Sequence, residues 1–109
     1  MRFPAVLLLV LTFSIPAFAS SRSQRTRGAA IFASTGCDHC HSIRNAGGHR
    51  GPDLSSVGRT MKKAAIRKQI AEGSKVMPAF GEILQPPQID DLVAYLRSCR
   101  DKKTIPAPH

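Results

Sequence analysis

Two cysteines and a histidine lie within one short segment, Cys37-Asp38-His39-Cys40-His41. This is the C-x-x-C-H pattern, in which two thiols three positions apart can each bond to one vinyl group of a haem. The histidine that follows them, His41, can then reach the iron as its proximal ligand. The spacing therefore predicts a chain that folds around a covalently attached haem c with its iron.

Three other interpretations use the same residues and stay open at this point. A redox-active C-x-x-C would follow a strand of a βαβ unit, and no strand pattern precedes Cys37. A structural zinc site needs four ligands, and most of the candidates are crowded into this one segment. These candidates are Cys37, Cys40, His41 and either His39 or His49. A disulfide between Cys37 and Cys40 is the third interpretation, which an oxidising compartment would permit.

The first 19 residues have the pattern of a secretory signal peptide. Arg2 is the only charged residue before Arg22, and most of the stretch between them is apolar. This stretch ends in a proline followed by Ala17-Phe18-Ala19, a small-x-small pattern typical of a cleavage site. We therefore expect cleavage after Ala19 and export to the periplasm or another extracytoplasmic space, with no stable membrane insertion afterwards. An uncleaved anchor is the alternative, because the uncharged stretch is close to the shortest length that spans a bilayer.

Removal of 19 of the 109 residues would leave 90, which is enough for one domain. A domain of this size buries only about 60% of its unfolded surface. Its core would be thin, because the whole chain has five Phe, one Tyr and no Trp. A haem would supply the missing apolar mass. We divide the chain into a signal peptide (1–19), a flexible leader (20–24), the domain (25–100) and a disordered tail (101–109).

Apolar periodicity predicts an all-α fold with about three main helices. The predicted helices cover residues 26–35, residues 61–72 and a segment that begins at Pro86. Thr26 and Thr60 are the expected N-caps of the first two helices, and Gly36 and Gly73 are expected to end them. The residues expected to face the core are Ala29, Phe32 and Ala33, then Ile66 and Ile70, and finally Ile89, Leu92, Val93 and Leu96. The residues between the first two helices, 42–57, are expected to form a loop.

A histidine-ligated haem iron has one further axial position. The candidates for it are Met61, Met77, His39, His49 and His109. Met77 lies in an irregular segment far enough along the chain to reach the other haem face, and Pro78 restricts it to an extended conformation. A thioether is a soft, neutral ligand that raises the reduction potential. His49 would give a lower potential, although its glycine-rich surroundings favour a surface loop, and a core methionine is the other interpretation of Met77.

The segment Gly51-Pro52-Asp53-Leu54 offers a partner for the proximal histidine. An iron-ligating histidine normally donates its other ring N–H to a carbonyl or a carboxylate. The Pro52 carbonyl could accept this hydrogen bond from His41. An ordinary Gly-Pro turn is the alternative, and the spacing does not decide between them.

Five short motifs occur in one order, and together they resemble a bacterial class I, monohaem c-type cytochrome. The motifs are Gly28-x-x-x-Phe32, Cys37-x-x-Cys40-His41, Gly51-Pro52-Asp53-Leu54, Met77-Pro78-Ala79-Phe80 and Leu92-Val93-Ala94-Tyr95-Leu96, within a resemblance that covers about Arg25 to Cys99. The resemblance implies the cytochrome c fold, with the terminal helices crossing near Gly28 and Tyr95. It implies a site with thioether links at Cys37 and Cys40, His41 and Met77 as axial ligands, and the Pro52 carbonyl bonded to His41.

The chain departs from the usual pattern of this family in two places. The last helix opens with Gln85-Pro86-Pro87-Gln88 rather than with Ser or Thr and acidic residues, and Gln is a poor cap. Cys99 stands where a bulky aliphatic residue is common. Because Cys99 continues the apolar face of the last helix, we expect a small buried hydrophobe rather than an intermolecular disulfide.

A haem with both axial positions filled leaves no open site for a substrate. We therefore expect a periplasmic one-electron carrier that shuttles electrons between redox proteins, without substrate turnover. The alternative is a cytochrome subunit, or dedicated electron acceptor, of a dehydrogenase or a terminal oxidase complex. A haem-based ligand sensor, in which Met77 is displaced, is a third interpretation.

The chain is basic, with 16 Lys and Arg against seven Asp and Glu and a net charge of +9. Such a surface attracts acidic partners or anionic membranes, while the scarcity of aromatic residues speaks against nucleic acid. Four basic residues gather on the second predicted helix, Lys62, Lys63, Arg67 and Lys68. They predict either a docking patch for an acidic redox partner or an ordinary solvated face. We expect a monomer.

Overall fold

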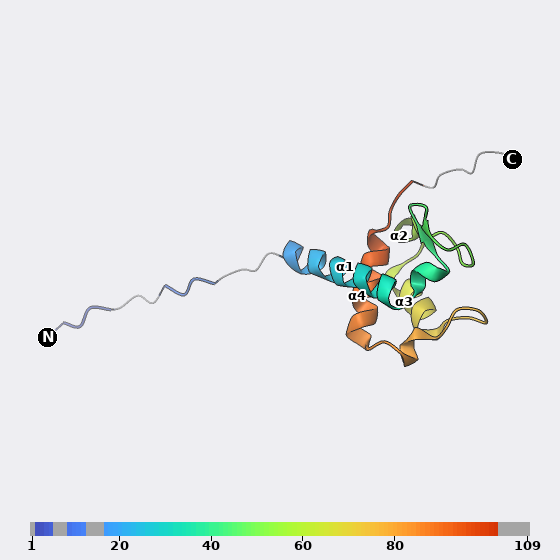
Figure 1. Cartoon of the computed structure of the whole chain (residues 1–109). Coiled ribbons are helices and arrows are strands. Elements are labelled where there is room, and N and C mark those ends of the chain that lie inside the picture. Colours follow the sequence, from blue (N-terminus) through green and yellow to red (C-terminus); the bar gives the residue numbers. More distant parts are fainter. Residues whose placement is uncertain (1, 6–8, 13–16, 103–109) are drawn as a thin grey trace.

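The computed structural model describes residues 2–5, 9–12 and 17–102, which form a mostly helical fold (Figure 1). The elements follow in the order α1 (Ala17–Ser34), η1 (Cys37–His39), β1 (Ser42–Ile43), β2 (Ala46–Gly47), α2 (Val57–Thr60), α3 (Lys63–Glu72), η2 (Phe80–Glu82) and α4 (Pro86–Ser98), where η is a 3₁₀ turn. The predicted all-α class is confirmed, with one small strand pair added to the helices.

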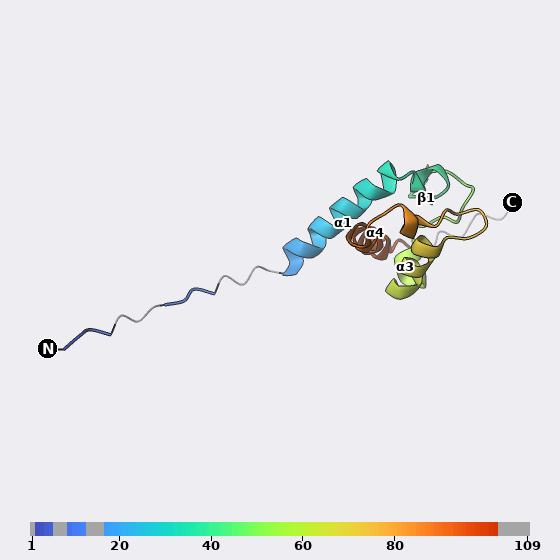
Figure 2. The ribbon, with the colours of Figure 1, turned by 90° about the horizontal axis from the view of Figure 1, so that it is seen from below.

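Helices α1 and α4 lie across each other, although they stand at opposite ends of the domain sequence (Figures 1 and 2). Gly28 lies at this crossing, where a Cβ atom would come within 2.1 Å of the Asp91 carbonyl oxygen and 2.6 Å of the Tyr95 Cβ. One turn further along α1, the ring of Phe32 meets that of Tyr95 edge to face, with centroids 5.8 Å apart. The crossing that the resemblance implied is confirmed.

The core is made by α4, by α1 and α3 packed against it, and by residues of the connecting segments. Its members are buried apolar side chains, namely Phe32, Val57, Ile66, Ile70, Phe80, Leu84, Ile89, Leu92, Val93, Leu96 and Cys99. The inward faces predicted for the second and third helices are therefore confirmed, and so is the burial of Cys99. The prediction for Ala33 is wrong, since α1 turns Gly28 and Phe32 towards α4 and leaves Ala33 exposed.

Helix α1 begins at Ala17, well before the predicted start at Thr26. Thr26 is not an N-cap, because its hydroxyl lies inside the helix and donates to the Arg22 carbonyl at 3.0 Å. Residues 17–27 contain neither Gly nor Pro, so no residue in this stretch strongly opposes a helix. Residues 20–24, predicted to be a flexible leader, are accordingly helical in the structure.

The second predicted helix, residues 61–72, is α3, which begins at Lys63 rather than at Met61 because Met61 is extended, with φ −123° and ψ 139°. A separate short helix that was not predicted, α2, precedes it. Thr60 is therefore not the N-cap of α3; it ends α2, and its hydroxyl donates to the Val57 carbonyl at 3.4 Å. Gly73 ends α3 as predicted, with a φ of 65°. Likewise, Gly36 follows α1 with a φ of 82°.

Helix α4 starts at Pro86, as predicted. Its expected lack of a good cap is compensated by Gln88, whose side-chain oxygen accepts a hydrogen bond from the Gln85 N–H at 2.8 Å. The strand pair within residues 42–57 was not predicted. Its turn residues, Arg44 and Asn45, both have a positive φ, as expected for a tight two-residue hairpin, and strands of two residues are too short to show an alternating pattern.

The predicted signal peptide and tail lie partly outside the described residues. Within the tail, Asp101 belongs to the folded part, because its N–H donates to the Ser55 carbonyl at 3.0 Å and its carboxylate pairs with Arg44 at 2.9 Å. The expected disorder of residues 103–109 concerns residues outside the described ranges. In the part of the chain that the structure describes, no helix has the length and apolar character needed to cross a bilayer.

Candidate functional site

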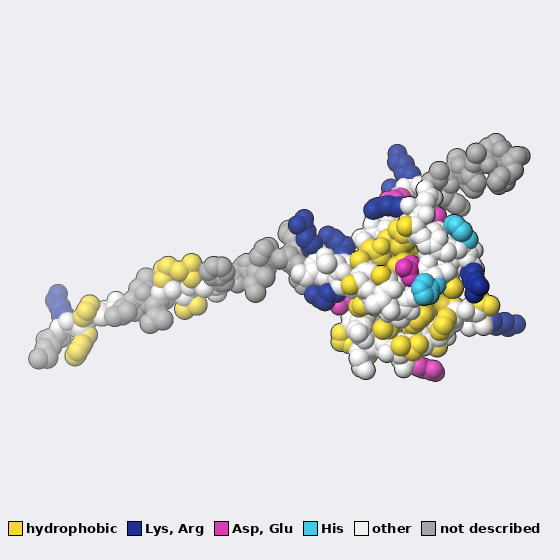
Figure 3. Space-filling view, viewed as in Figure 1, with side chains coloured by type: hydrophobic (Ala, Val, Ile, Leu, Met, Phe, Trp, Pro, Cys, Tyr) yellow, Lys and Arg dark blue, Asp and Glu magenta, His cyan; other side chains and the backbone are white. Residues whose placement is uncertain are grey.

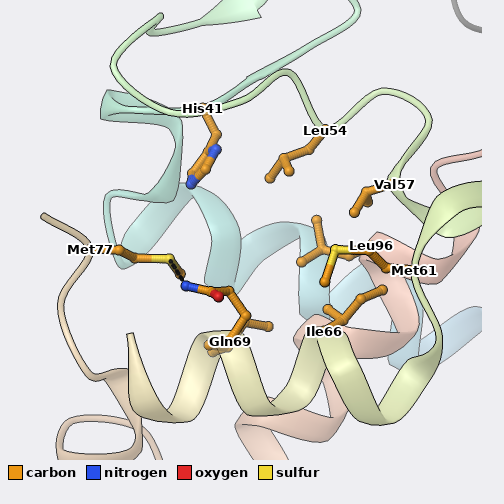
Figure 4. A pocket seen from close by; sticks show the side chains of 9 residues that line it. His41, Leu54, Val57, Met61, Ile66, Gln69, Met77 and Leu96 are labelled. Atoms are coloured by element: carbon orange, nitrogen blue, oxygen red, sulfur yellow. Dashed lines mark hydrogen bonds between the residues drawn. The ribbon is translucent and has the colours of Figure 1, made fainter. Parts of the chain in front are cut away.

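A largely apolar pocket lies between α3, α4 and the loops on either side of α3 (Figure 4). It encloses about 340 Å³ of space, part of it open to solvent. The lining side chains are His41, Leu54, Val57, Met61, Ile66, Gln69, Ile70, Met77 and Leu96. Apart from His41 and Gln69, this lining is hydrophobic, so the pocket suits a flat apolar group held by a few polar atoms.

The segment from Cys37 to His41 forms a single tight turn. The left-handed conformation of Gly36 redirects the chain after α1 into the 3₁₀ turn. The Cys37 carbonyl then accepts hydrogen bonds from the backbone N–H groups of Cys40, at 3.3 Å, and His41, at 3.0 Å. This turn carries both thiols and the imidazole on one compact segment. The structure forms no disulfide between Cys37 and Cys40, and burial raises the pKa of the Cys37 thiol.

The orientation of His41 is fixed by the loop at residues 51–52. With its proton on Nδ1, the ring donates to the Pro52 carbonyl oxygen at 2.8 Å. The ring also lies directly against Gly51, where a Cβ atom would come within 2.5 Å of His41 Cε1. A glycine is therefore required beside the ring. The imidazole points into the pocket (Figure 4), and Nε2 is left free to bind a ligand.

Met77 enters the same pocket from the loop between α3 and η2 (Figure 4). A tight turn holds it, in which the Ser74 N–H donates to the Met77 carbonyl at 2.9 Å and the Met77 N–H donates to the Ser74 hydroxyl at 3.2 Å. Gly73 has to be a glycine here, because its φ is positive and a Cβ atom would lie 2.4 Å from the Met77 carbonyl oxygen. The turn thus aims the thioether sulfur inwards.

Gln69 is a pocket residue that the sequence reasoning missed. Its side-chain amide donates to the sulfur of Met77 at 3.6 Å (Figure 4). The sequence holds one weak signal for it, since Gln69 follows the inward-facing Ile66 by three positions on a helix. Its contact with Met77 depends on how the next loop folds back, which helical spacing does not report.

The other candidates for an axial ligand have different surroundings. Met61 also lines the pocket, beside Ile66 and Leu96 and away from His41 (Figure 4). His39 and His49 are both exposed, and His109 lies outside the described residues. The zinc interpretation finds no support among the described residues, where no three His, Cys, Asp or Glu side chains gather into a metal site.

This arrangement fits a haem. An imidazole nitrogen and a thioether sulfur are the two donors that c-type haem iron takes as axial ligands, and both face one pocket. The apolar walls would pack against the macrocycle. Two thiols stand on the same turn as the imidazole, where each could bond to one vinyl group.

The basic cluster predicted on α3 is partly neutralised. Arg67 forms an ion pair with Asp90 of α4, and Lys68 lies 4.0 Å from Glu72 on the following helical turn. Lys62 and Lys63, at the start of α3, are exposed. The cluster therefore presents less net charge than the sequence suggested.

Comparison with known proteins gives consistent matches. The family described as "Cytochrome C oxidase, cbb3-type, subunit III" matches residues 23–96. A cytochrome c6 from Nostoc sp. is 35% identical over 102 residues, which cover 84% of this chain and 82% of the relative. A cytochrome c6 from Gloeothece citriformis is 28% identical over 109 residues, which cover 90% of this chain and 89% of the relative. No solved structure gives a significant match.

Proposed function

Since the chain belongs to the class I, monohaem c-type cytochromes, we propose that it is an extracytoplasmic one-electron carrier between redox proteins. The observation that supports this most directly is the pair of donors in one apolar pocket, the imidazole of His41 and the thioether of Met77. Haem c, when bound, supplies a reversible one-electron change at its iron. The chain holds, orients and shields this group.

We assign four side chains to hold the haem. Cys37 and Cys40 each supply one sulfur for a thioether link, and His41 and Met77 supply the two axial ligands. The spacing of the two thiols and the donor set of the pocket support this assignment. Because two protein side chains then occupy both axial positions, we expect no substrate to reach the metal and no enzymatic turnover.

Pro52 acts on the site through His41. Its carbonyl accepts the Nδ1 proton at 2.8 Å, which fixes the tautomer, orients the ring and makes Nε2 a better donor. Met77 is oriented by its own turn with Ser74. These hydrogen bonds would hold both side chains in place where they would bind the iron.

A visible spectrum tests this assignment. We expect the full chain, produced in a host that matures c-type cytochromes, to carry a pigment that acidified acetone does not extract. Its ferric form should show the weak band near the red end of the spectrum that sulfur–iron ligation gives. Met77→Ala should remove this band and keep the pigment.

Met61→Leu is the matched control, because Met61 lines the same pocket and is the other methionine of the domain. This variant should keep the band. A colourless product would contradict the proposed function, whereas a band that survives Met77→Ala and disappears with Met61→Leu would contradict only the ligand assignment. Carbon monoxide binding to the reduced wild-type protein at neutral pH would favour the ligand sensor.

A second function is a subunit of a terminal oxidase complex, which the description of the matching family favours. A dedicated electron acceptor of a dehydrogenase belongs to the same class of alternatives. Isolation from the native membrane under mild conditions separates these cases. A free carrier should elute as a small monomer, whereas a subunit should elute together with its larger partners.

The signal peptide and the partner surface complete the proposal. We infer that cleavage after Ala19 releases the protein into the periplasm, which N-terminal sequencing of the mature protein would test. We also infer that the redox partner is acidic, with Lys62 and Lys63 as the exposed remainder of the α3 cluster. Electron transfer that is indifferent to ionic strength would contradict this steering.

A further inference from the structure

Three arginines on the N-terminal part of α1 take no part in the haem site. They are Arg22, Arg25 and Arg27. We call the segment that contains them, residues 20–27, the basic arm; its other residues are polar. The first acidic residue of the whole chain is Asp38, so the arm carries positive charge with no carboxylate near it in sequence. The arm directly follows the predicted signal peptide.

The arm projects from the body of the domain (Figures 1 and 2). The contact of α1 with α4 is centred on Gly28 and Phe32, beyond the end of the arm. Arg27 is the one arginine tied to the body, through a pair of hydrogen bonds to Asp91 at 2.8 and 3.1 Å. Arg22 and Arg25 are exposed, and no carboxylate of the described residues forms an ion pair with either of them.

Several arginines elsewhere in the domain are used differently. Arg44 and Arg67 are paired with Asp101 and Asp90, and Arg97 donates to the carbonyl oxygens of Gly58 and Met61. Among the described residues, Arg22 and Arg25 thus present guanidinium groups that form no ion pair, and Figure 3 shows dark blue side chains around α1.

We propose that the basic arm binds the surface of an anionic phospholipid bilayer. Guanidinium groups pair well with phosphate, and each arginine near an anionic surface adds to the attraction. The remaining side chains of the arm are polar, namely Ser20, Ser21, Ser23, Gln24 and Thr26. A surface without apolar or aromatic anchors lacks the centre of a protein–protein interface, whereas a charged lipid surface requires none.

This contact would keep the carrier at the membrane. It does not depend on whether the haem assignment is correct. It also does not depend on insertion of an apolar segment, because Arg22 and Arg25 remain in the chain after cleavage at Ala19.

Sedimentation with lipid vesicles tests the proposal, with the haem-loaded protein as produced by the maturing host. We expect binding to vesicles of phosphatidylglycerol and phosphatidylcholine at low salt, and none to phosphatidylcholine alone. Salt at about 1 M, where the screening length is about 3 Å, should release the protein. The R22Q/R25Q variant should bind about tenfold more weakly. Both positions are exposed, so its melting temperature should match that of the wild type.

The matched control is K62Q/K63Q, which removes the same charge from the start of α3 and should bind nearly as well as the wild type. An equal loss in both variants would overturn the proposal, because binding would then follow net charge alone. Binding that survives high salt or occurs on pure phosphatidylcholine would also overturn it and indicate a retained apolar anchor. A third outcome would also overturn the proposal: the wild type does not bind vesicles, and the R22Q/R25Q variant transfers electrons to an acidic partner more slowly than the wild type. The arm would then bind a protein and not a membrane.

Discussion

The crossing of α1 and α4 is built by different means from the segment that carries most of the pocket lining, residues 37–84, which we call the pocket half. At the crossing, protein groups pack directly on one another, since Gly28 lies against the backbone of α4 and the ring centroids of Phe32 and Tyr95 are 5.8 Å apart. In the pocket half, short turns and loops surround about 340 Å³ of mostly apolar space. Its precise contacts, such as Gly51 against His41, position single side chains and do not fill that space.

This difference separates two sources of stability. The crossing gains its stability from close packing of two helices, which requires no other group. The pocket half has apolar walls whose burial depends on what occupies the space between them. We therefore expect the crossing to be sensitive to added volume, and the pocket half to be sensitive to loss of the haem.

The largest expected effect is on the pocket half, from the double variant C37S/C40S. Without thioether links the haem should be lost during purification, and with it about 4 kcal/mol or more of stability, since a tightly held group stabilises the folded state by this amount. Hydrogen exchange should show lost protection in residues 40–79, with α4 protected longest. Visible absorption and thermal unfolding measure the loss.

The control for this change is Cys99→Ser, which alters the third cysteine at a buried position outside the turn. It should keep the haem and lose only about 1 kcal/mol. If C37S/C40S melted at the same temperature as the wild type, the pocket half would not depend on its cofactor, and the distinction between the two regions would be lost.

The next largest effect is expected at the crossing, from Gly28→Ala. The added methyl would lie only 2.1 Å from the Asp91 carbonyl oxygen. The two helices therefore have to separate, which should lower the stability by about 3 kcal/mol. Thermal unfolding monitored by far-UV circular dichroism measures this loss of stability. Gly81→Ala is the control in the pocket half, because its methyl would meet the Ala71 carbonyl oxygen at the milder distance of 2.9 Å. Equal losses in the two variants would contradict the special role of the crossing.

The sequence predicted those features that depend on local chemistry. Helix α4 follows from Pro86 and an apolar stripe at helical spacing, and the ends of α1 and α3 follow from Gly36 and Gly73. The C-x-x-C-H pattern pointed to the turn that carries His41. These signals act over a few residues, which is why one sequence was sufficient to find them.

The features that were missed depend on contacts between distant segments or on the absence of a signal. The start of α1 was placed too late because Thr26 resembles a cap, while no residue before it forbids a helix. Met61 was predicted to open the second helix, but its backbone is extended and its side chain lines the pocket, so α3 begins at Lys63. The bond from Gln69 to the Met77 sulfur joins two segments whose approach is set by the fold.

A smaller effect should follow from Gly51→Ala, which tests how tightly the pocket half positions one ligand. The new methyl would lie 2.5 Å from His41 Cε1, so the ring has to tilt away from the Pro52 carbonyl. We expect a loss of about 1–2 kcal/mol in stability and a shifted reduction potential, measured by thermal unfolding and by redox titration. Pro52→Ala is the control: it keeps the backbone carbonyl, so it should change the stability and the reduction potential less than Gly51→Ala does. An unchanged potential in Gly51→Ala would show that the ring is not held by this loop.

The smallest predicted effect concerns an ion pair between the two regions, in which Arg44 of the pocket half binds Asp101, a residue that follows α4. The hydrogen bond from Arg44 holds the pKa of Asp101 below its ordinary value. A lowered folded-state pKa stabilises the protein above the ordinary aspartate pKa of about 4, and this stabilisation is lost as the pH falls through the lowered value. The wild type should therefore melt slightly above Asp101→Asn at neutral pH, and the difference should close in acid. Glu82→Gln is the control, because this side chain is exposed. If the gap in melting temperature between wild type and Asp101→Asn widened in acid, the pair would not stabilise the folded state.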